Sequence, residues 1–178
     1  KKTGTKKKKR NRKKNKKKKA PAVVIPEALK QPSRAIGPGG RLVLYEHAQL
    51  RLYHTTRTVI RLGLYDGDTV VAVKRTPLHP DEDEREKDLR EKDLFKKLRH
   101  DNIAKYYDYV VEGDASRGFL LYLALEPCVV LSPGGQAQSC TLRRWAASPA
   151  PRGRRAPAAK LAVARGMCEG LRYLHDDA

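Results

Sequence analysis

The stretch TVVAVKRTPL, residues 69–78, is an apolar run with the character of a β-strand and carries one lysine, Lys74, before Pro77 stops it. A lysine ammonium is a compact positive charge that can bind a phosphate oxygen when its flexible side chain is held in place. Glu91 follows seventeen residues later, at the start of a charged segment, and its carboxylate could hold the lysine. Most Lys and Glu side chains are ordinary exposed charges, which is the alternative interpretation of this pair.

Lys74 lies in a region of apolar runs of strand length. Runs rich in Val, Leu and Tyr predict five strands, at residues 41–47, 57–65, 69–75, 104–112 and 118–126. The second and third runs meet across Asp66-Gly67-Asp68. Asp-Gly between two apolar runs is typical of a β-hairpin, because glycine tolerates the positive φ that the turn requires.

Two longer segments have helical character. Residues 81–100 begin with acidic side chains, which suit the positive end of a helix dipole. Their apolar residues fall on one narrow face that is expected to pack on the sheet, namely Leu89, Leu94, Phe95 and Leu98. Residues 158–175 predict an amphipathic helix that needs a larger helical domain to cover it, so we expect marginal stability or aggregation. A short helix is expected to begin at Thr141.

The charge of this 178-residue chain is concentrated at one end. The formal net charge is +19, and residues 1–19 hold fourteen Lys or Arg and no acid. Such a block repels itself and is predicted to be a disordered tail. Screened electrostatics would let it bind nucleic acid, anionic lipid or a nuclear import receptor, and a purely solubilising tail is the alternative. Composition leaves these partners open.

The cysteines and the hydropathy pattern bear on the compartment. Cys128, Cys140 and Cys168 lie far apart with no C-x-x-C spacing, which argues against a disulfide framework or a zinc site and favours a reducing compartment. No apolar run reaches the roughly 18 residues of a membrane span, so we expect no transmembrane segment. The chain is predicted to be intracellular, in the cytoplasm or the nucleus.

Four segments occur together in a recognisable order: VAVKR, EKDLFKKLRHDNIAKYYDY, YLALEPC and ARGMCEGLRYLHDD. They resemble, in turn, the phosphate-lysine strand, helix C with its following strand, the fifth strand with the hinge, and the helix before the catalytic loop of eukaryotic protein kinases. VAVKR followed by ALEPC is most similar to the inositol-requiring stress-sensor kinases of the endoplasmic reticulum.

The resemblance implies an α+β fold and a division of the chain. Residues 1–40 would be the basic disordered tail and linker. Residues 41–126 would form a kinase N-lobe, with a five-stranded antiparallel sheet and helix C. Residues 127–178 would hold the hinge, an enlarged loop and the first helices of an incomplete C-lobe.

The resemblance also implies a role for each matching residue. Lys74 would contact the α- and β-phosphates of ATP, and Glu91 would hold Lys74 by an ion pair. The adenine would be contacted by a small residue on the sheet, the gatekeeper and the hinge backbone, namely Ala72, Leu125, Glu126 and Cys128. Mg²⁺ would accompany the ATP, but its ligands are not in this chain.

Two departures from the kinase pattern matter. Leu52, His54 and Arg57 stand where the three glycines of the phosphate-binding loop are expected, which would crowd the nucleotide and leaves a pseudokinase scaffold as an alternative. The sequence also stops before the catalytic-loop H-R-D and the metal-binding D-F-G. We therefore expect a fragment of a Ser/Thr-type kinase that phosphorylates protein substrates only in its complete form. A basic nucleic-acid-binding protein, acting through residues 1–19, is the second alternative.

Overall fold

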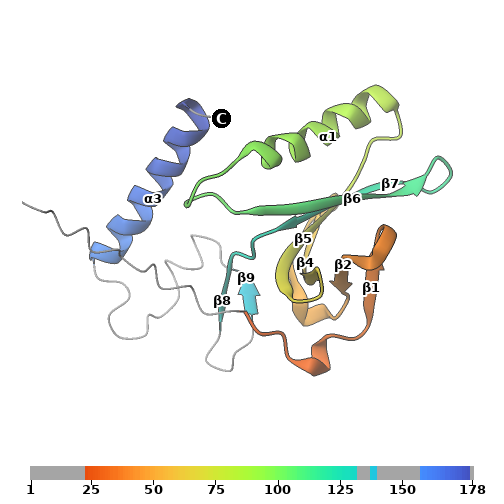
Figure 1. Ribbon diagram of the computed structural model, residues 1–178, viewed down its shortest axis with the longest axis horizontal. Coiled ribbons are helices and arrows are strands. Elements are labelled where there is room, and N and C mark those ends of the chain that lie inside the picture. Colours follow the sequence, from red (N-terminus) through yellow and green to blue (C-terminus); the bar gives the residue numbers. More distant parts are fainter. Residues whose placement is uncertain (1–22, 132–136, 140–156, 177–178) are drawn as a thin grey trace, which may run out of the picture.

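The computed structural model describes residues 23–131, 137–139 and 157–176. They form an α+β fold in which a curled antiparallel sheet carries a helix on one side (Figure 1). The sheet strands are β1 (Ser33–Ile36), β2 (Leu42–Tyr45), β3 (Arg51–His54), β4 (Val59–Tyr65), β5 (Thr69–Pro77), β6 (Tyr106–Asp114) and β7 (Gly118–Leu125). Their spatial order is β1-β2-β4-β5-β7-β6, with β3 paired to β4.

The other regular elements are short turns, a small hairpin and two long helices. Strands β8 (Val129–Leu131) and β9 (Ala137–Ser139) pair only with each other. The α-helices of the described residues are α1 (Glu82–Lys97) and α3 (Pro157–Asp176), which confirms both long predicted helices. Neither helix is long and apolar enough to cross a membrane. The helix expected from Thr141 lies outside the described residues.

The hairpin predicted at Asp66-Gly67-Asp68 is confirmed. Strands β4 and β5 are antiparallel neighbours, and Tyr65 pairs with Thr69 across the turn. Asp66 and Gly67 have φ values of 50° and 82°, in the left-handed region that an Asp-Gly sequence accommodates. The strand that carries Lys74 is therefore anchored at its first residue by a sequence-encoded turn.

The prediction of five strands was wrong, because the sheet has seven. Strand β1 lies within the segment expected to be a linker, and β3 lies in a stretch for which no strand was predicted. Both are only four residues long, too short for a periodic pattern to emerge. Tertiary contacts define β1 instead: it pairs with β2, and its Ile36 is fully buried in the core.

The sheet has two unlike faces because successive side chains alternate across it. One face, here called the concave face, buries a continuous core of Ile36, Leu42, Leu44, Val71, Val73, Tyr122 and Ala124. The sheet curls around this face until its two edge strands touch. Arg34 of β1 and Glu112 of β6 form an ion pair of 3.2 Å there, and the Gly37 N–H donates to the same carboxylate at 2.8 Å.

The opposite face, here called the helix face, carries α1 (Figure 1). Asp81 caps α1 by accepting hydrogen bonds from the N–H groups of Asp83 and Glu84, at 3.1 and 3.2 Å. The helix packs its Leu89 and Phe95 on a core of Leu78, Tyr106, Leu121 and Leu123. The prediction for Leu94 was wrong: its side chain is 62 % exposed, because the stripe in contact with the sheet is narrower than the apolar pattern suggested.

Candidate functional site

The predicted site residues on the sheet are brought together by the pairing of β5 with β7. Ala72 lies opposite Leu125, and Lys74 lies opposite Leu123. Paired residues project to the same side of a sheet, and residues two apart on one strand do so as well. Ala72, Lys74 and Leu125 therefore share the helix face.

Lys74 stands between two apolar clusters of the helix face. On the β4 side is a core of Ile25, Tyr45, Leu50 and Leu62, and on the β7 side is the core beneath α1. Ala72 pairs with Leu62 in one direction and with Leu125 in the other, so it is the small residue at the boundary. The Lys74 side chain, which is half-buried, starts from this boundary. A flexible side chain flanked by apolar packing loses freedom, which suits a positioned cation.

Glu91 lies in the middle of α1, on the helix that covers this face. Its side chain is outside the described part of the structure, so the Lys74–Glu91 ion pair stays a prediction. Other side chains of α1 show how the helix is held on the sheet. The ammonium groups of Lys92 and Lys96 lie 4.9 and 4.5 Å from the centre of the Tyr109 ring, and the Arg85 guanidinium lies 4.6 Å from that of Phe119. Charged residues of α1 thus contact the sheet through aromatic rings.

The chain after β7 is held by reciprocal hydrogen bonds with the start of β6. The Glu126 N–H donates to the Lys105 carbonyl at 2.7 Å, and the Lys105 N–H donates to the Glu126 carboxylate at 3.1 Å. Two residues further on, Cys128 is exposed and forms no disulfide. Glu126 is therefore the residue at which hydrogen bonds to Lys105 fix the predicted hinge.

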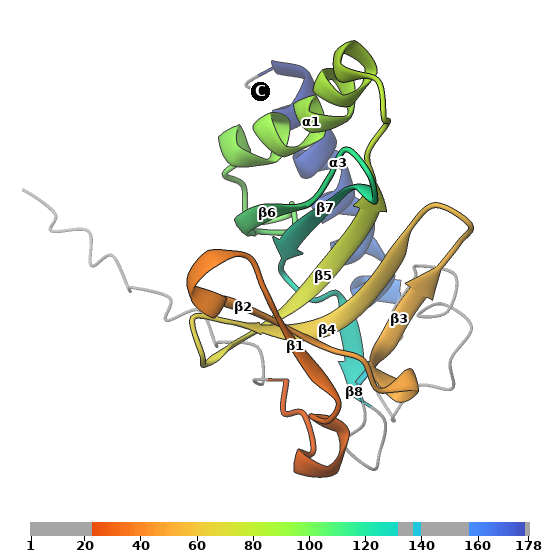
Figure 2. The same cartoon turned by 90° about the vertical axis from the view of Figure 1, so that its right-hand side faces the viewer.

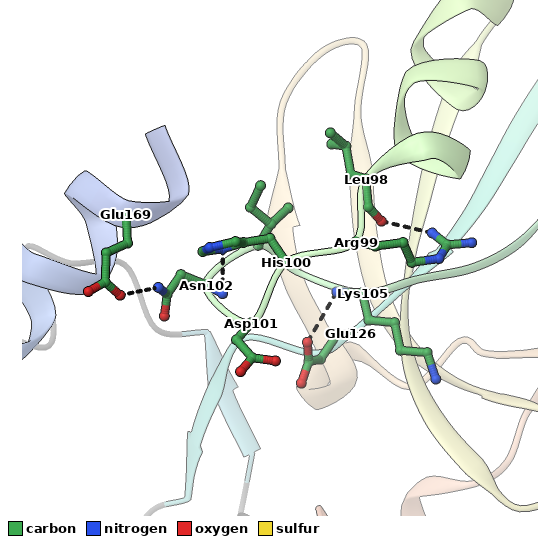
Figure 3. Close-up of a pocket in the computed structure, with 9 residues that line it drawn as sticks. Leu98, Arg99, His100, Asp101, Asn102, Lys105, Glu126 and Glu169 are labelled. Carbon is green, nitrogen blue, oxygen red and sulfur yellow. Dashed lines mark hydrogen bonds between the residues drawn. The ribbon is translucent and has the colours of Figure 1, made fainter. Parts of the chain in front are cut away.

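A cavity of about 710 Å³ lies next to Glu126 and Lys105, below the end of α1 (Figure 3). It is lined by Leu98, Arg99, His100, Asp101, Asn102, Ile103, Lys105, Glu126 and Glu169. Of the predicted site residues whose side chains the structure describes, only Glu126 lines it. The sequence does not indicate this cavity, because its charged lining looks like an ordinary solvent-exposed loop between a helix and a strand.

The loop that lines the cavity also holds α3. The Asn102 side-chain amide donates to the Glu169 carboxylate at 3.0 Å, and the Arg99 N–H donates to the Tyr173 hydroxyl at 3.1 Å. The His100 and Tyr173 rings stack with centres 5.1 Å apart. The guanidinium of Arg165, together with the Asn102 amide, lowers the pKa of the Glu169 carboxyl. The attachment of α3 is thus mostly polar.

The residues that occupy the expected glycine positions lie in the β3–β4 hairpin. Leu52 packs against the same apolar cluster as Val70 and Val129, whereas His54 and Arg57 are exposed. The turn is closed by two threonines: the Thr55 N–H donates to the Thr58 carbonyl at 2.8 Å, and the Thr58 N–H donates to the Thr55 hydroxyl at 2.9 Å. This is a compact hairpin with side chains on both faces.

The described residues hold no group of three or more His, Cys, Asp or Glu side chains that could bind a metal ion. Comparison with known proteins gives no further assignment: no protein-family model matches the chain, and no curated protein matches its sequence. The interpretation of the site therefore depends on its geometry and on its chemistry.

Proposed function

We propose that the helix face between β4, β5 and β7 binds ATP, and that the chain is the nucleotide-binding part of a Ser/Thr-type protein kinase. The observation that carries the proposal is the strand register. It places Lys74 two residues along β5 from Ala72, which pairs with Leu125, on the face that α1 covers. A small residue, an apolar wall and a cation in this order suit an adenine ring with phosphates directed toward the lysine.

The proposal gives each residue of the site a chemical role. The Lys74 ammonium would neutralise phosphate charge as a point cation. Ala72 would leave room for the adenine plane, and Leu125 would bound it at the back. The Glu126 N–H already donates to Lys105, so Glu126 would offer its carbonyl to the adenine edge. Cys128, which is exposed, would offer its backbone.

The sequence contains no H-R-D and no D-F-G motif. For these residues the proposal is therefore nucleotide binding, and phosphoryl transfer to protein hydroxyls is proposed only for a complete kinase. The described residues contain no carboxylate cluster for Mg²⁺, so the metal would enter bound to ATP.

The proposal is tested by calorimetric titration of the chain with MgATP and, separately, with magnesium tripolyphosphate. We expect ATP to bind more tightly than tripolyphosphate, because only ATP presents an adenine to the sheet. Lys74→Met should weaken ATP binding by about tenfold or more, the loss of a charge-assisted contact. Lys97→Met is the matched control, since Lys97 is exposed at the end of α1, and it should bind as the parent chain does.

Two results would overturn the nucleotide-binding proposal. Equal affinity for ATP and tripolyphosphate would reduce the binding to unspecific attraction by basic residues. A folded chain with no saturable ATP binding would favour the second candidate, a pseudokinase scaffold. That candidate is supported by Leu52, His54 and Arg57 at the glycine positions and by the closed Thr55–Thr58 turn. Binding of nucleic acid through residues 1–19 concerns residues outside the described structure.

A further inference from the structure

Strand β3 pairs with β4 at one end of the sheet (Figure 2). The strand register places three arginines on the concave face at this end. Arg51 of β3 lies directly opposite Arg61 of β4. Arg75 of β5 pairs with Val59, two residues before Arg61 on the same face of β4. Adjacent strands are about 4.8 Å apart and each residue rises about 3.4 Å along its strand, so the three side chains start within roughly 12 Å of one another. Lys74 projects from the opposite face of the same strand.

The charge of this arginine cluster is not neutralised within the described structure. Four other arginines of that structure do pair with carboxylates, namely Arg34, Arg41, Arg85 and Arg165. No described carboxylate forms an ion pair with Arg51, Arg61 or Arg75. Arg61 is instead held by the backbone, since its Nη1 donates to the carbonyls of Glu46 and His47 at 2.8 and 3.3 Å. These carbonyls fix the guanidinium and leave its positive charge in place.

The arrangement is unfavourable for the protein alone. Like charges that lie directly opposite in a sheet destabilise it. Burial lowers the pKa of the Arg61 guanidinium and the charge of Arg51 lowers it further, whereas the charge of Glu46 raises it by more than that of Arg75 lowers it. An anion bound between the three side chains would remove this repulsion.

We propose that Arg51, Arg61 and Arg75 form a binding site for a compact multivalent phosphate anion, supplied by a soluble polyphosphate or by a phosphoinositide headgroup. The planar guanidinium offers paired N–H donors that match phosphate oxygens two at a time. Three arginines within about 12 Å match two neighbouring phosphate groups rather than a long polymer, which would need a track of cations and stacking rings. The site is separate from the proposed ATP site, because it lies on the other face.

The experiment uses the full chain and titrates inorganic pyrophosphate by calorimetry. Arg61 also holds the Glu46–His47 backbone, so the test variant changes only the two exposed members, Arg51→Gln with Arg75→Gln. The matched control is Arg90→Gln with Arg117→Gln, which removes the same charge at exposed positions without a described ion pair. We expect at least a tenfold loss of affinity in the test variant and less than a twofold change in the control. Equal losses in both variants would overturn the proposal.

Two further arms identify the source of the anion and separate this site from the nucleotide site. The first arm uses vesicles of phosphatidylcholine with phosphatidylinositol bisphosphate. Binding of these vesicles by the parent chain but not by the test variant would identify a phosphoinositide headgroup as the anion. Pyrophosphate binding without vesicle binding would assign a soluble anion. Single-stranded RNA that binds through these arginines while pyrophosphate does not would overturn the proposal. When Lys74→Met is already present, the Arg51→Gln and Arg75→Gln changes should still weaken pyrophosphate binding. Failure of the ATP proposal therefore leaves the phosphate-site proposal standing.

Discussion

The sheet and helix α3 place their apolar residues in opposite environments. In the sheet Leu62, Val71, Val73 and Tyr122 are completely buried, and both faces have a core. On α3 the large apolar side chains stay exposed, with Leu161 at 70 % and Leu171 at 53 %. The sheet is held by apolar burial, whereas α3 is held by a few polar contacts to residues 99–103.

This difference indicates where the stability of the described structure resides. Burial of apolar surface is the largest favourable contribution to folding, and exposed side chains contribute almost none of it. The sheet should therefore unfold as one cooperative unit, whereas α3 should open locally at much lower free energy. The proposed ATP and phosphate sites both lie on the more stable unit.

The largest expected effect tests this difference directly with one substitution in each region. Leu62→Ala removes a fully buried side chain from the centre of β4 and should lower the free energy of unfolding by about 4 kcal/mol. Leu171→Ala makes the same chemical change on exposed α3 and should lower it by less than about 0.5 kcal/mol. Urea denaturation followed by circular dichroism measures both. Similar losses in the two variants would show that α3 is packed in solution.

The sequence predicted the elements that have a local cause. The β4–β5 turn follows from Asp66-Gly67, and α1 begins directly after its cap Asp81, where acidic residues follow. What could not be predicted depends on contacts between distant segments. Gly63 is an example: a Cβ there would lie 2.3 Å from the Val43 carbonyl oxygen, so β2 can approach β4 only at a glycine. Nothing in the residues around Gly63 indicates that approach.

The candidate site divides in the same way. The alternation of VAVKR places Ala72 and Lys74 on one face, because strand geometry alone decides it. The 710 Å³ cavity and the arginine cluster were missed, since each combines segments that are far apart in the chain. Arg51 faces Arg61 only because β3 pairs with β4 through an irregular register between Arg51 and Tyr53.

A second prediction concerns a hydroxyl inside the sheet core. Tyr106 is only 8 % exposed, and its hydroxyl has no hydrogen-bond partner among the described residues. Burial, assisted by the charge of Asp108, raises the pKa of Tyr106 from 10.0 to about 12. Below pH 10 the phenol is neutral in both states, so its contribution to stability is complete. As the pH rises from 10 to 12 the unfolded chain ionises first, and stability is lost.

Tyr106→Phe should remove that loss. Between pH 7 and pH 12 the free energy of unfolding should fall by about 2 to 3 kcal/mol less in the variant than in the parent chain. At pH 7 it should be as stable or slightly more stable, because the deleted hydroxyl is buried without a partner. Urea titrations between pH 7 and 12 give both values. Parallel curves for the two proteins would mean that Tyr106 is hydrated rather than buried.

The smallest expected effect concerns the attachment of α3. Asn102→Ala removes the 3.0 Å hydrogen bond to Glu169, which should destabilise the docked helix by about 1 kcal/mol and speed amide exchange in α3 roughly fivefold. Arg165→Ala is the control, because Arg165 contacts Glu169 from within the same helix and does not join α3 to the loop. Amides of β5 and β7 should exchange at parental rates in both variants. Faster exchange in those strands after Asn102→Ala would contradict the separation of the two regions, because the loop that holds α3 would then also support the sheet.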